Sequence, residues 1–455
     1  MDIKKYGGML MNKKPKHIFG NPLVYLAIGT IIGSYAYIAI NTYFLLGAVL
    51  AALFFSILFM TCNMRFAFIV SLISIVSYGN TAFYYDYNLP RSHIEEIRII
   101  SVSDEFILGQ CRGKLINVYS NYKIEEGNYL KARINFYHNK NLSRGIVGNV
   151  KIIRIEEKKK GIGTYSRRMK EEYFEKLSYK IGKSNSEFVM ATALGESNKL
   201  EEELKDQMKT LGIIHVTAIS GFHIGIIYGG LSAIFGNFIG VLGITTYIMI
   251  VGVKASVFRA YLMIMVSIIG KKLYRNDNGI ATICLSAIVI IFLRPYYIVD
   301  VGFALSFLAI LGIIMFSKKL MRMMYMLPKY LNKSISVALA AQVFTAPYMI
   351  IVFGEINISF LIGNIFLIPL ISIIIVLGNV GLMVFKIELI FNFIALTLNY
   401  ILNIFNVARE SLFMVSVKSF NIGIGGCAFY MLGLIVIFYN SYRRDEIYDR
   451  FDAVR

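Results

Sequence analysis

The chain has 455 residues, of which 56% are hydrophobic, and it carries 47 Lys and Arg residues against 28 Asp and Glu residues, a formal net charge of +19. This composition excludes an ordinary soluble globular protein and indicates one that crosses a membrane many times. The basic excess suits anionic lipid headgroups, and it equally suits a polyanionic substrate.

Three apolar runs open the chain, each close to the ~20 residues that a helix needs to cross a bilayer. They are Pro22 to Ile40, Tyr43 to Met60 and Phe66 to Tyr85. Lysines before the first run resemble the start of a signal peptide, but the two runs that follow at once indicate a retained membrane segment. We therefore assign residues 1–85 to N-terminal transmembrane helices.

A polar region follows at residues 86–160, where short β-type segments are separated by Gly, Asn and Asp turn signals. A small closed β-barrel is the simplest fold for several such strands. Because the basic N-terminus is expected to stay in the cytoplasm, three crossings place this domain on the extracytoplasmic side. Lys and Arg outnumber Asp and Glu between Asp86 and Ser186, so the region can attract a polyanion.

Two amphipathic helices are predicted within residues 161–211. The first, Tyr165 to Lys183, repeats apolar residues every four positions with basic residues on its other faces, which is typical of a helix on a membrane surface. The second has an apolar side from Leu200 to Leu211, and Asn198 with Glu201 has the spacing of a capping box.

Residues 212–440 are mostly apolar and form the predicted channel domain, and residues 441–455 are a predicted cytoplasmic tail. Several of the apolar runs are shorter than a full crossing, so re-entrant or broken helices are expected. The sequence predicts a polytopic α-helical membrane protein of about 10 to 12 transmembrane helices with an extracytoplasmic β-barrel domain.

The stretch from Ile213 to Val253 has no charged residue but contains His215, Ser220 and His223. Polar side chains in hydrocarbon are costly unless they face partners or water, so these three are expected to point inward. A hydrogen-bonded interior histidine is the more common explanation, and a shared ligand site is the alternative.

Glycines recur every fourth residue within that same stretch, at Gly221, Gly225 and Gly229. Such a strip bares the backbone so that another helix can approach closely. A broken helix that lines a path is the other interpretation, and the sequence does not decide between them.

Two charged residues beside the later spans are also candidates. Arg259 lies a few residues inside an apolar run, where an arginine is a functional candidate unless it reaches the headgroups. Asp300 precedes another run, where an N-cap of the next helix is the plainer interpretation.

Amides and prolines within the apolar runs are the last candidates for lining a path through the membrane. Gln342 with Pro347, and Asn364 with Pro369, combine a hydrogen-bonding side chain with a residue that breaks or kinks helices. These groups, with the histidines, Ser220 and Arg259, can donate hydrogen bonds to phosphates.

Catalytic signals are weak. The five histidines form no HxH or HExxH pattern, so no metal centre is expected. Gly182, Lys183 and Ser184 resemble the end of a phosphate-binding loop, but Leu177 stands where its first glycine belongs. We expect no cofactor and no enzymatic activity.

Six ordered segments of the chain resemble the ComEC competence-channel family. They are ALGES at 193–197, GIIHVTAISGFHIGI at 212–226, RAYLM at 259–263, RPYYIVDVGFALSF at 294–307, QVFTAP at 342–347 and NIFLIP at 364–369. The resemblance implies three leading helices, an external OB-type barrel and a polytopic competence domain. Many members also carry a C-terminal metallo-β-lactamase-like nuclease domain, which we do not expect here, since the chain ends at Arg455 soon after its last apolar run.

This resemblance implies passage of single-stranded DNA through the bacterial cytoplasmic membrane during natural transformation. The expected partners are single-stranded DNA, membrane lipids, a separate ATPase or helicase motor, a DNA receptor and a separate nuclease, and a homo-oligomer is left open. Two rival functions are a permease for a lipid, peptide or small molecule, and a non-transporting scaffold of an uptake complex.

Overall fold

The structure is a computed structural model, and it describes residues 21–42, 44–86, 92–103, 106–122, 124–252, 255–272, 278–356, 359–416, 420–421, 426, 430 and 433. The predicted tail at 441–455 and the lysine-rich N-terminus lie outside these residues. The chain forms two compact units, the first from residues 1–170 and 227–304 and the second from 171–226 and 305–455.

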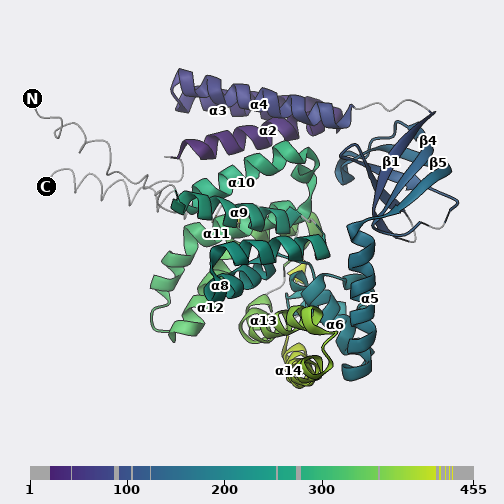
Figure 1. Ribbon diagram of the computed structural model, residues 1–455. Helices are drawn as coiled ribbons and strands as arrows, with labels where there is room; N and C mark the ends of the chain where they lie inside the picture. The colour runs from purple at the N-terminus through teal and green to yellow at the C-terminus, as the bar shows by residue number, and fades with distance from the viewer. Residues whose placement is uncertain are drawn as a thin grey trace, which may run out of the picture. The chain divides into compact units, whose positions relative to one another are not determined.

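The three predicted opening spans are confirmed as helices of the first unit (Figure 1); they are α2 (Pro22–Thr42), α3 (Phe44–Thr61) and α4 (Met64–Tyr85). Small polar side chains join α2 to α4. Ser34 and Ser77 share a hydrogen bond of 2.7 Å between their hydroxyl oxygens, and the Thr81 hydroxyl donates to Ser34 Oγ at 3.0 Å. All three side chains are buried. Small residues allow such close helix approach in membranes, so packing rather than transport explains them.

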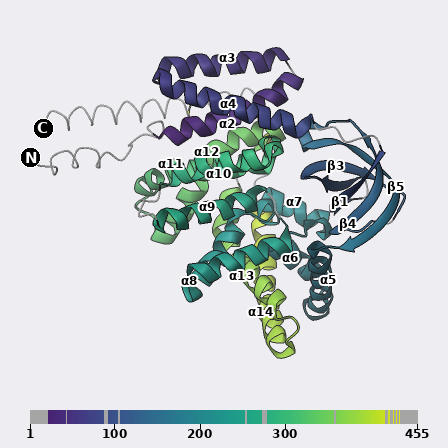
Figure 2. The same ribbon diagram turned by 45° about the horizontal axis from the view of Figure 1, so that its top comes forward.

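The polar region forms a closed five-stranded barrel, as predicted (Figures 1 and 2). Its strands are β1 (Ser92–Val102), β2 (Ile107–Cys111), β3 (Lys114–Tyr119), β4 (Asn128–Tyr137) and β5 (Ile146–Lys160). The order is β1-β2-β3-β5-β4 with β1 paired to β4, and β3 runs parallel to β5. This is the strand arrangement of an OB-like barrel. The short helix η2 (Leu142–Arg144) lies in the loop between β4 and β5.

The first predicted amphipathic helix is α5 (Ile162–Ile181), and its apolar side is covered by protein. In the second unit Tyr173 and Leu177 are completely buried, and the Tyr173 hydroxyl donates to the Gly378 carbonyl at 3.0 Å. Lys176 Nζ lies 3.3 Å from the Phe385 carbonyl. The helix therefore packs against other helices of the chain through the face that we assigned to the membrane surface.

The predicted second amphipathic helix is α7 (Glu202–Thr210), and the capping box proposed for it is wrong. Glu201 occupies the N-cap position without a side-chain hydrogen bond, and Asn198 lies in the separate short helix η3 (Ser197–Lys199). Between α5 and α7 the structure adds α6 (Lys183–Leu194), which is buried from Ser186 to Leu194. The amphipathic pattern missed α6 because a helix that is buried on all sides has no polar face.

Helix α8 (Gly221–Val251) is broken at Gly236, where φ is 83° and ψ is 168°. The two arms fold back on each other. A Cβ at Gly240 would lie 3.0 Å from Tyr228, one at Gly243 would lie 2.1 Å from Leu231, and the Tyr228 hydroxyl donates to Asn237 at 2.9 Å. At about 1.5 Å per residue each arm is only ~22 Å long, less than the ~30 Å of a hydrocarbon core. The expected broken helix is present.

The remaining apolar helices are α9 (Ala255–Lys272), α10 (Gly279–Leu293), α11 (Val301–Met323), α12 (Lys329–Phe353), α13 (Phe360–Val384) and α14 (Glu388–Val415). Two-residue strands β6 (Glu355–Ile356) and β7 (Phe420–Asn421) pair with each other. By length and composition alone, seven described helices could cross a membrane when α8 is counted at its full 31 residues, and three apolar segments are shorter. The fold is therefore a polytopic helical membrane protein with an OB-like barrel, as predicted.

Candidate functional site

His223 joins the start of α8 to the end of α6 in the second unit. Its side chain is completely buried, and its Nε2 lies 2.6 Å from the Thr192 carbonyl. The Ser220 backbone N–H donates to Nδ1 at 3.3 Å, so Nδ1 is an acceptor and the ring proton belongs on Nε2. The Ser220 hydroxyl in turn accepts from the Phe222 N–H at 3.2 Å and caps α8. This geometry favours the hydrogen-bonded interior histidine.

The carboxyl end of α6 receives a second side chain from α13. Asn379 Nδ2 lies 3.5 Å from the Ala193 carbonyl and 2.8 Å from the Ile375 carbonyl of its own helix. A Cβ at Gly378 would lie 2.9 Å from the Ala193 side chain, so this glycine sets the close approach of the two helices. The last carbonyls of a helix lack partners within it, and His223 and Asn379 supply them.

His215 and Asn364 flank a tight crossing in the same unit. A Cβ at Gly363, in the first turn of α13, would lie 2.2 Å from the Leu211 carbonyl, so only glycine fits there. His215 lies in the short helix η4 (Ile214–Val216), exposed, with Nδ1 3.0 Å from the Gly212 carbonyl. Asn364 follows Gly363 and is half-buried. His215 thus lies in η4 and not in α8, and the expectation that it faces a partner or a water-filled path stays a prediction.

Arg259 and Asp300 belong to the first unit. Arg259 is buried by protein in α9, with 4% of its surface exposed, and the choice between a site inside a span and one near the headgroups stays a prediction. Asp300 is exposed and accepts a hydrogen bond of 2.6 Å from the Phe303 N–H in the first turn of α11. Asp300 is therefore an N-cap, the plainer of its two interpretations.

Gln342 and Pro347 lie in α12, which continues through the proline. A proline at this position leaves the carbonyl of Val343 without its helical partner. The Tyr430 hydroxyl donates to that carbonyl at 3.3 Å. The Gln342 side chain accepts from the Thr345 hydroxyl at 3.1 Å. The expectation that Pro347 breaks its helix is therefore wrong, because a tyrosine from far along the chain replaces the missing bond.

The other predicted breaking and packing residues also behave differently. Pro369 lies inside α13, which runs from Phe360 to Val384 without interruption. Gly221 is the first residue of α8. Among the described residues, no atom outside the glycine's own stretch of helix lies within 4 Å of a Cβ built on Gly225 or Gly229, so the packing contact that was one of the two open interpretations is not formed there. The break in α8 falls instead at Gly236.

No pattern in the sequence predicted the junction between the barrel and the helices. Lys114 of β3 is buried, and its Nζ donates to the carbonyls of Phe83 and Tyr84 at the end of α4. The Tyr84 hydroxyl donates to the Gly145 carbonyl and accepts from the Leu115 N–H, each at 3.0 Å. Burial lowers the pKa of Lys114 to about 8, and Asp86 offsets part of that effect.

The loop between β4 and β5 is part of this junction. The Tyr85 hydroxyl donates to the Leu142 carbonyl at 3.2 Å, and a Cβ at Gly145 would lie 2.5 Å from Tyr296. Tyr296 belongs to the short helix η5 (Pro295–Val299), and the centroid of its ring lies 5.3 Å from the ring centroid of Tyr84. Asp86 follows Tyr85 at the end of α4, and its hydrogen bond with Lys140 lowers the pKa of its carboxyl group. A cluster of tyrosines therefore holds the barrel against α4 and η5.

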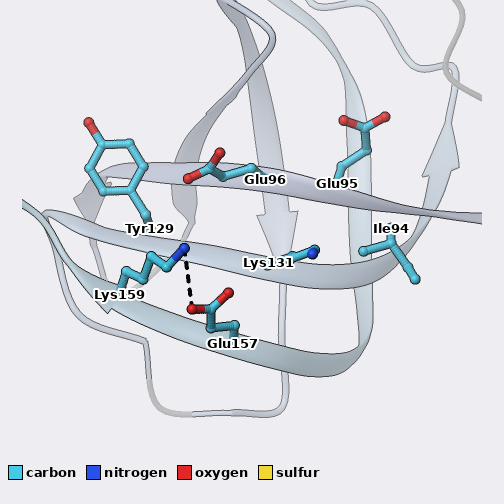
Figure 3. A pocket seen from close by; sticks show the side chains of 7 residues that line it. All are labelled: Ile94, Glu95, Glu96, Tyr129, Lys131, Glu157 and Lys159. Atoms are coloured by element: carbon cyan, nitrogen blue, oxygen red, sulfur yellow. Dashed lines mark ion pairs between the residues drawn. The ribbon is translucent and has the colours of Figure 1, made fainter.

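A hollow of about 210 Å³ lies on the outside of the barrel (Figure 3). Its lining mixes both charges, with Lys159 3.2 Å from Glu157 on β5 and with Glu96 on β1, across the intervening strand β4. Glu95 at its edge is paired with Arg112 at 2.5 Å. Such a neutralised hollow is a poor anion site. Within the described part of the chain, no group of three His, Cys, Asp or Glu residues is placed to hold a metal ion.

Fold and site together define a polytopic membrane protein with a broken helix, buried polar anchors at helix ends and an OB-like barrel. A family model described as Competence protein matches residues 193–444, more than half of the chain. The chain belongs to this family, in agreement with the resemblance of its six segments to ComEC.

Two relatives extend the comparison. The chain is 29% identical to ComE operon protein 3 of Bacillus subtilis (strain 168) over 202 residues, which are 42% of this chain and 26% of that protein. It is 27% identical to an uncharacterized protein of Aquifex aeolicus (strain VF5) over 135 residues, 28% of this chain and 33% of that protein. The chain thus spans between a quarter and a third of these relatives. No solved structure matches it.

Proposed function

We propose that the protein is a channel of the bacterial cytoplasmic membrane that passes single-stranded DNA inward during natural transformation. The observation that carries the proposal is the Competence match over residues 193–444, which includes the broken helix α8. The likeness to ComE operon protein 3 of Bacillus subtilis, a protein named after the ComE operon, also supports the proposal. In this proposal the chain is a conduit and not an enzyme, so a separate ATPase or helicase drives the strand.

Helix α8 supplies the physical support. Backbone groups at Gly236 leave the helical pattern, and residues 233–239 around it are exposed in the chain. Non-helical backbone at membrane depth is tolerated only where it is buried in protein or faces water. A hairpin whose arms are each too short to cross therefore suits the wall of a water-filled path. Arg259, which is buried by protein, and the half-buried Asn364 provide donors for passing phosphates in the same proposal.

The test separates DNA binding from DNA entry. A deletion strain receives wild-type protein, Arg259→Ala or Asn364→Leu, and labelled DNA is scored at the cell surface and in the cytoplasm. We expect both variants to insert and to accumulate normally, with surface DNA retained and entry abolished. Asp300→Asn is the matched control, because an asparagine can still cap α11 and entry should remain.

Other results identify the rival functions. Normal entry in both variants at wild-type protein levels makes these side chains dispensable, as a scaffold predicts. Binding of another solute that neither nucleic acid nor salt concentration changes indicates a permease for that solute. A separate receptor and nuclease are expected partners in the channel proposal, and deletion of the receptor should lower surface DNA without changing the protein itself.

The topology has its own measurement. We propose that the barrel lies outside the cytoplasm and both termini inside, since three helices precede the barrel, the N-terminal residues are basic and Lys and Arg gather in the later loops. In a cysteine-free background, Asn139→Cys in the exposed β4–β5 loop should react with a membrane-impermeant maleimide in intact cells. Lys318→Cys should react only after permeabilisation. The opposite pattern would invert the proposed orientation.

A further inference from the structure

One half of the barrel's outer surface combines exposed tyrosines with basic side chains. Strand register places Tyr137 opposite Asn149, Asn135 opposite Lys151 and Arg133 opposite Arg154 across β4 and β5. These positions alternate with buried ones such as Ile134 and Ile152, so their side chains share the outer face. We name this surface the Tyr–Arg face; it consists of Tyr119, Tyr122, Arg133, Tyr137, Lys151 and Arg154.

The third strand and its following loop extend the face. Tyr119 of β3 pairs with Lys151 of β5, and the Tyr122 hydroxyl lies 3.4 Å from the Ile153 carbonyl. Tyr119, Tyr122 and Tyr137 have exposed fractions of 51%, 48% and 54%. Large aromatic rings left in solvent beside cations suit the stacking of bases near their phosphates.

The charge of the face distinguishes it from the other half of the same sheet. Among the described residues, Arg133, Lys151 and Arg154 make no ion pair and are exposed. The hollow at the opposite end has carboxylates, including Glu157 paired with Lys159. Uncompensated cations are free to neutralise phosphates and release their counterions, whereas paired ones are not.

The face also differs from the surface that OB folds commonly use. Ligands usually contact strands 2 and 3 together with the loops between strands 1 and 2 and strands 4 and 5. Here the loop between β4 and β5 is held by Tyr84 and Tyr85 through the carbonyls of Gly145 and Leu142. This contact occupies the part of the loop from Leu142 to Gly145, and the Tyr–Arg face begins before it at Tyr137 and follows β4 and β5.

We infer that the Tyr–Arg face binds single-stranded DNA and guides it along β4 and β5 toward the junction with α4. The inference rests on the proposed function and adds the surface that receives the strand. The cations contact the phosphates and the tyrosines stack on bases, so binding is tolerant of sequence and prefers single strands to duplex.

The experiment uses the full chain in nanodiscs of zwitterionic lipid and a fluorescent oligothymidine of about 16 nucleotides, the upper site size of one OB fold. Lys151→Ala/Arg154→Ala is compared with Lys158→Ala/Lys160→Ala, which removes the same charge from exposed positions of the same strand. The first pair should lower the slope of log affinity against log salt by about 1.4, at about 0.7 per lost phosphate contact. The control pair should leave the slope unchanged.

The tyrosines are tested separately. Tyr119→Ala should weaken binding about tenfold, equivalent to about 1.4 kcal/mol, while Tyr119→Phe keeps the ring and the affinity. Tyr179→Ala removes an 87% exposed tyrosine outside the barrel and should change nothing. Retained affinity in Tyr119→Ala, or an equal loss of salt dependence in the Lys151/Arg154 and Lys158/Lys160 variants, would overturn the inference.

Two further outcomes distinguish this inference from lipid binding by the same face and from the proposed channel function. If the Lys151/Arg154 variant loses binding to vesicles of anionic lipid but not to the oligonucleotide, the face is a lipid-contacting surface and the inference fails. If wild-type protein does not bind the oligonucleotide at low salt, the inference also fails, while the entry of labelled DNA still decides whether the chain is a channel.

Discussion

Replacing His223 with leucine separates anchoring from a direct role in passage. Leucine removes the donor to the Thr192 carbonyl and the acceptor for the Ser220 N–H, which lie 2.6 Å and 3.3 Å from the ring nitrogens. Two buried groups left unsatisfied at ~1 to 3 kcal/mol each give a loss of roughly 2 to 6 kcal/mol. Hydrogen bonds measured inside membranes average about 0.6 kcal/mol, which sets a lower bound of about 1 kcal/mol for the two.

Conservative variants divide the effect between the two ring nitrogens. In His223→Gln an amide nitrogen takes the place of Nε2, so donation to Thr192 is retained and much of the stability should return. In His223→Asn the amide oxygen takes the place of Nδ1, so only the bond from Ser220 remains. Unfolding by sodium dodecyl sulfate in mixed micelles, followed by circular dichroism, should find the wild type most stable, His223→Gln less stable and His223→Leu least stable.

Uptake of labelled DNA is measured in the same variants at matched protein levels. If His223 is an anchor, entry should follow stability, and His223→Gln should remain active. The reasoning would be refuted by a leucine variant as stable as wild type, or by a stable glutamine variant that no longer passes DNA. Either result would assign the imidazole itself to the path.

Three further predictions concern backbone and charge at other positions. Gly236→Ala should destabilise the α8 hairpin by ~1 to 3 kcal/mol, since φ of 83° with ψ of 168° is accessible essentially to glycine alone, and faster proteolysis of α8 would report it. Tyr430→Phe should cost ~1 to 3 kcal/mol by leaving the Val343 carbonyl unpaired, and adding Pro347→Ala should recover part of it; additive effects in this double-mutant cycle would contradict the contact. Lys114 has a pKa of about 8 in the folded protein against 10.5 when exposed, so the unfolded chain binds more protons between these values and stability should rise with pH across that window. Lys114→Met should remove this rise, and a pH profile identical to wild type would contradict the assignment.

Elements with a strong local pattern were predictable from the sequence. The opening helices follow from three apolar runs of crossing length, and they match α2, α3 and α4 within a few residues. The barrel follows from short β-type segments, and Asp300 as an N-cap follows from its place before an apolar run. In each case the decisive interaction lies within a few residues or within one repeating pattern.

Features that depend on distant partners were not predictable. Pro347 indicates a break by local rules, but Tyr430 supplies the missing hydrogen bond from 87 positions away. The glycine that does break α8, Gly236, looks in the sequence like its neighbours Gly225 and Gly229, because only the fold decides which glycine takes a positive φ. Docking of the barrel loop on Tyr84 is likewise a contact between segments far apart in the chain.

The polar residues of the candidate path differ in how much hydrogen-bonding capacity they have left for a substrate. Both ring nitrogens of His223 are occupied by backbone groups, Asp300 caps a helix, and the Gln342 side chain accepts from a neighbouring threonine. A side chain that already completes the backbone must break that bond before it contacts a phosphate, and each such bond costs about 1 kcal/mol. Asn364 makes no side-chain hydrogen bond within the described chain and is only half-buried, beside the crossing that glycine at 363 creates. Its amide is therefore the group on this list best able to exchange one partner for another, as conduction requires of a binding site that must also release its ligand.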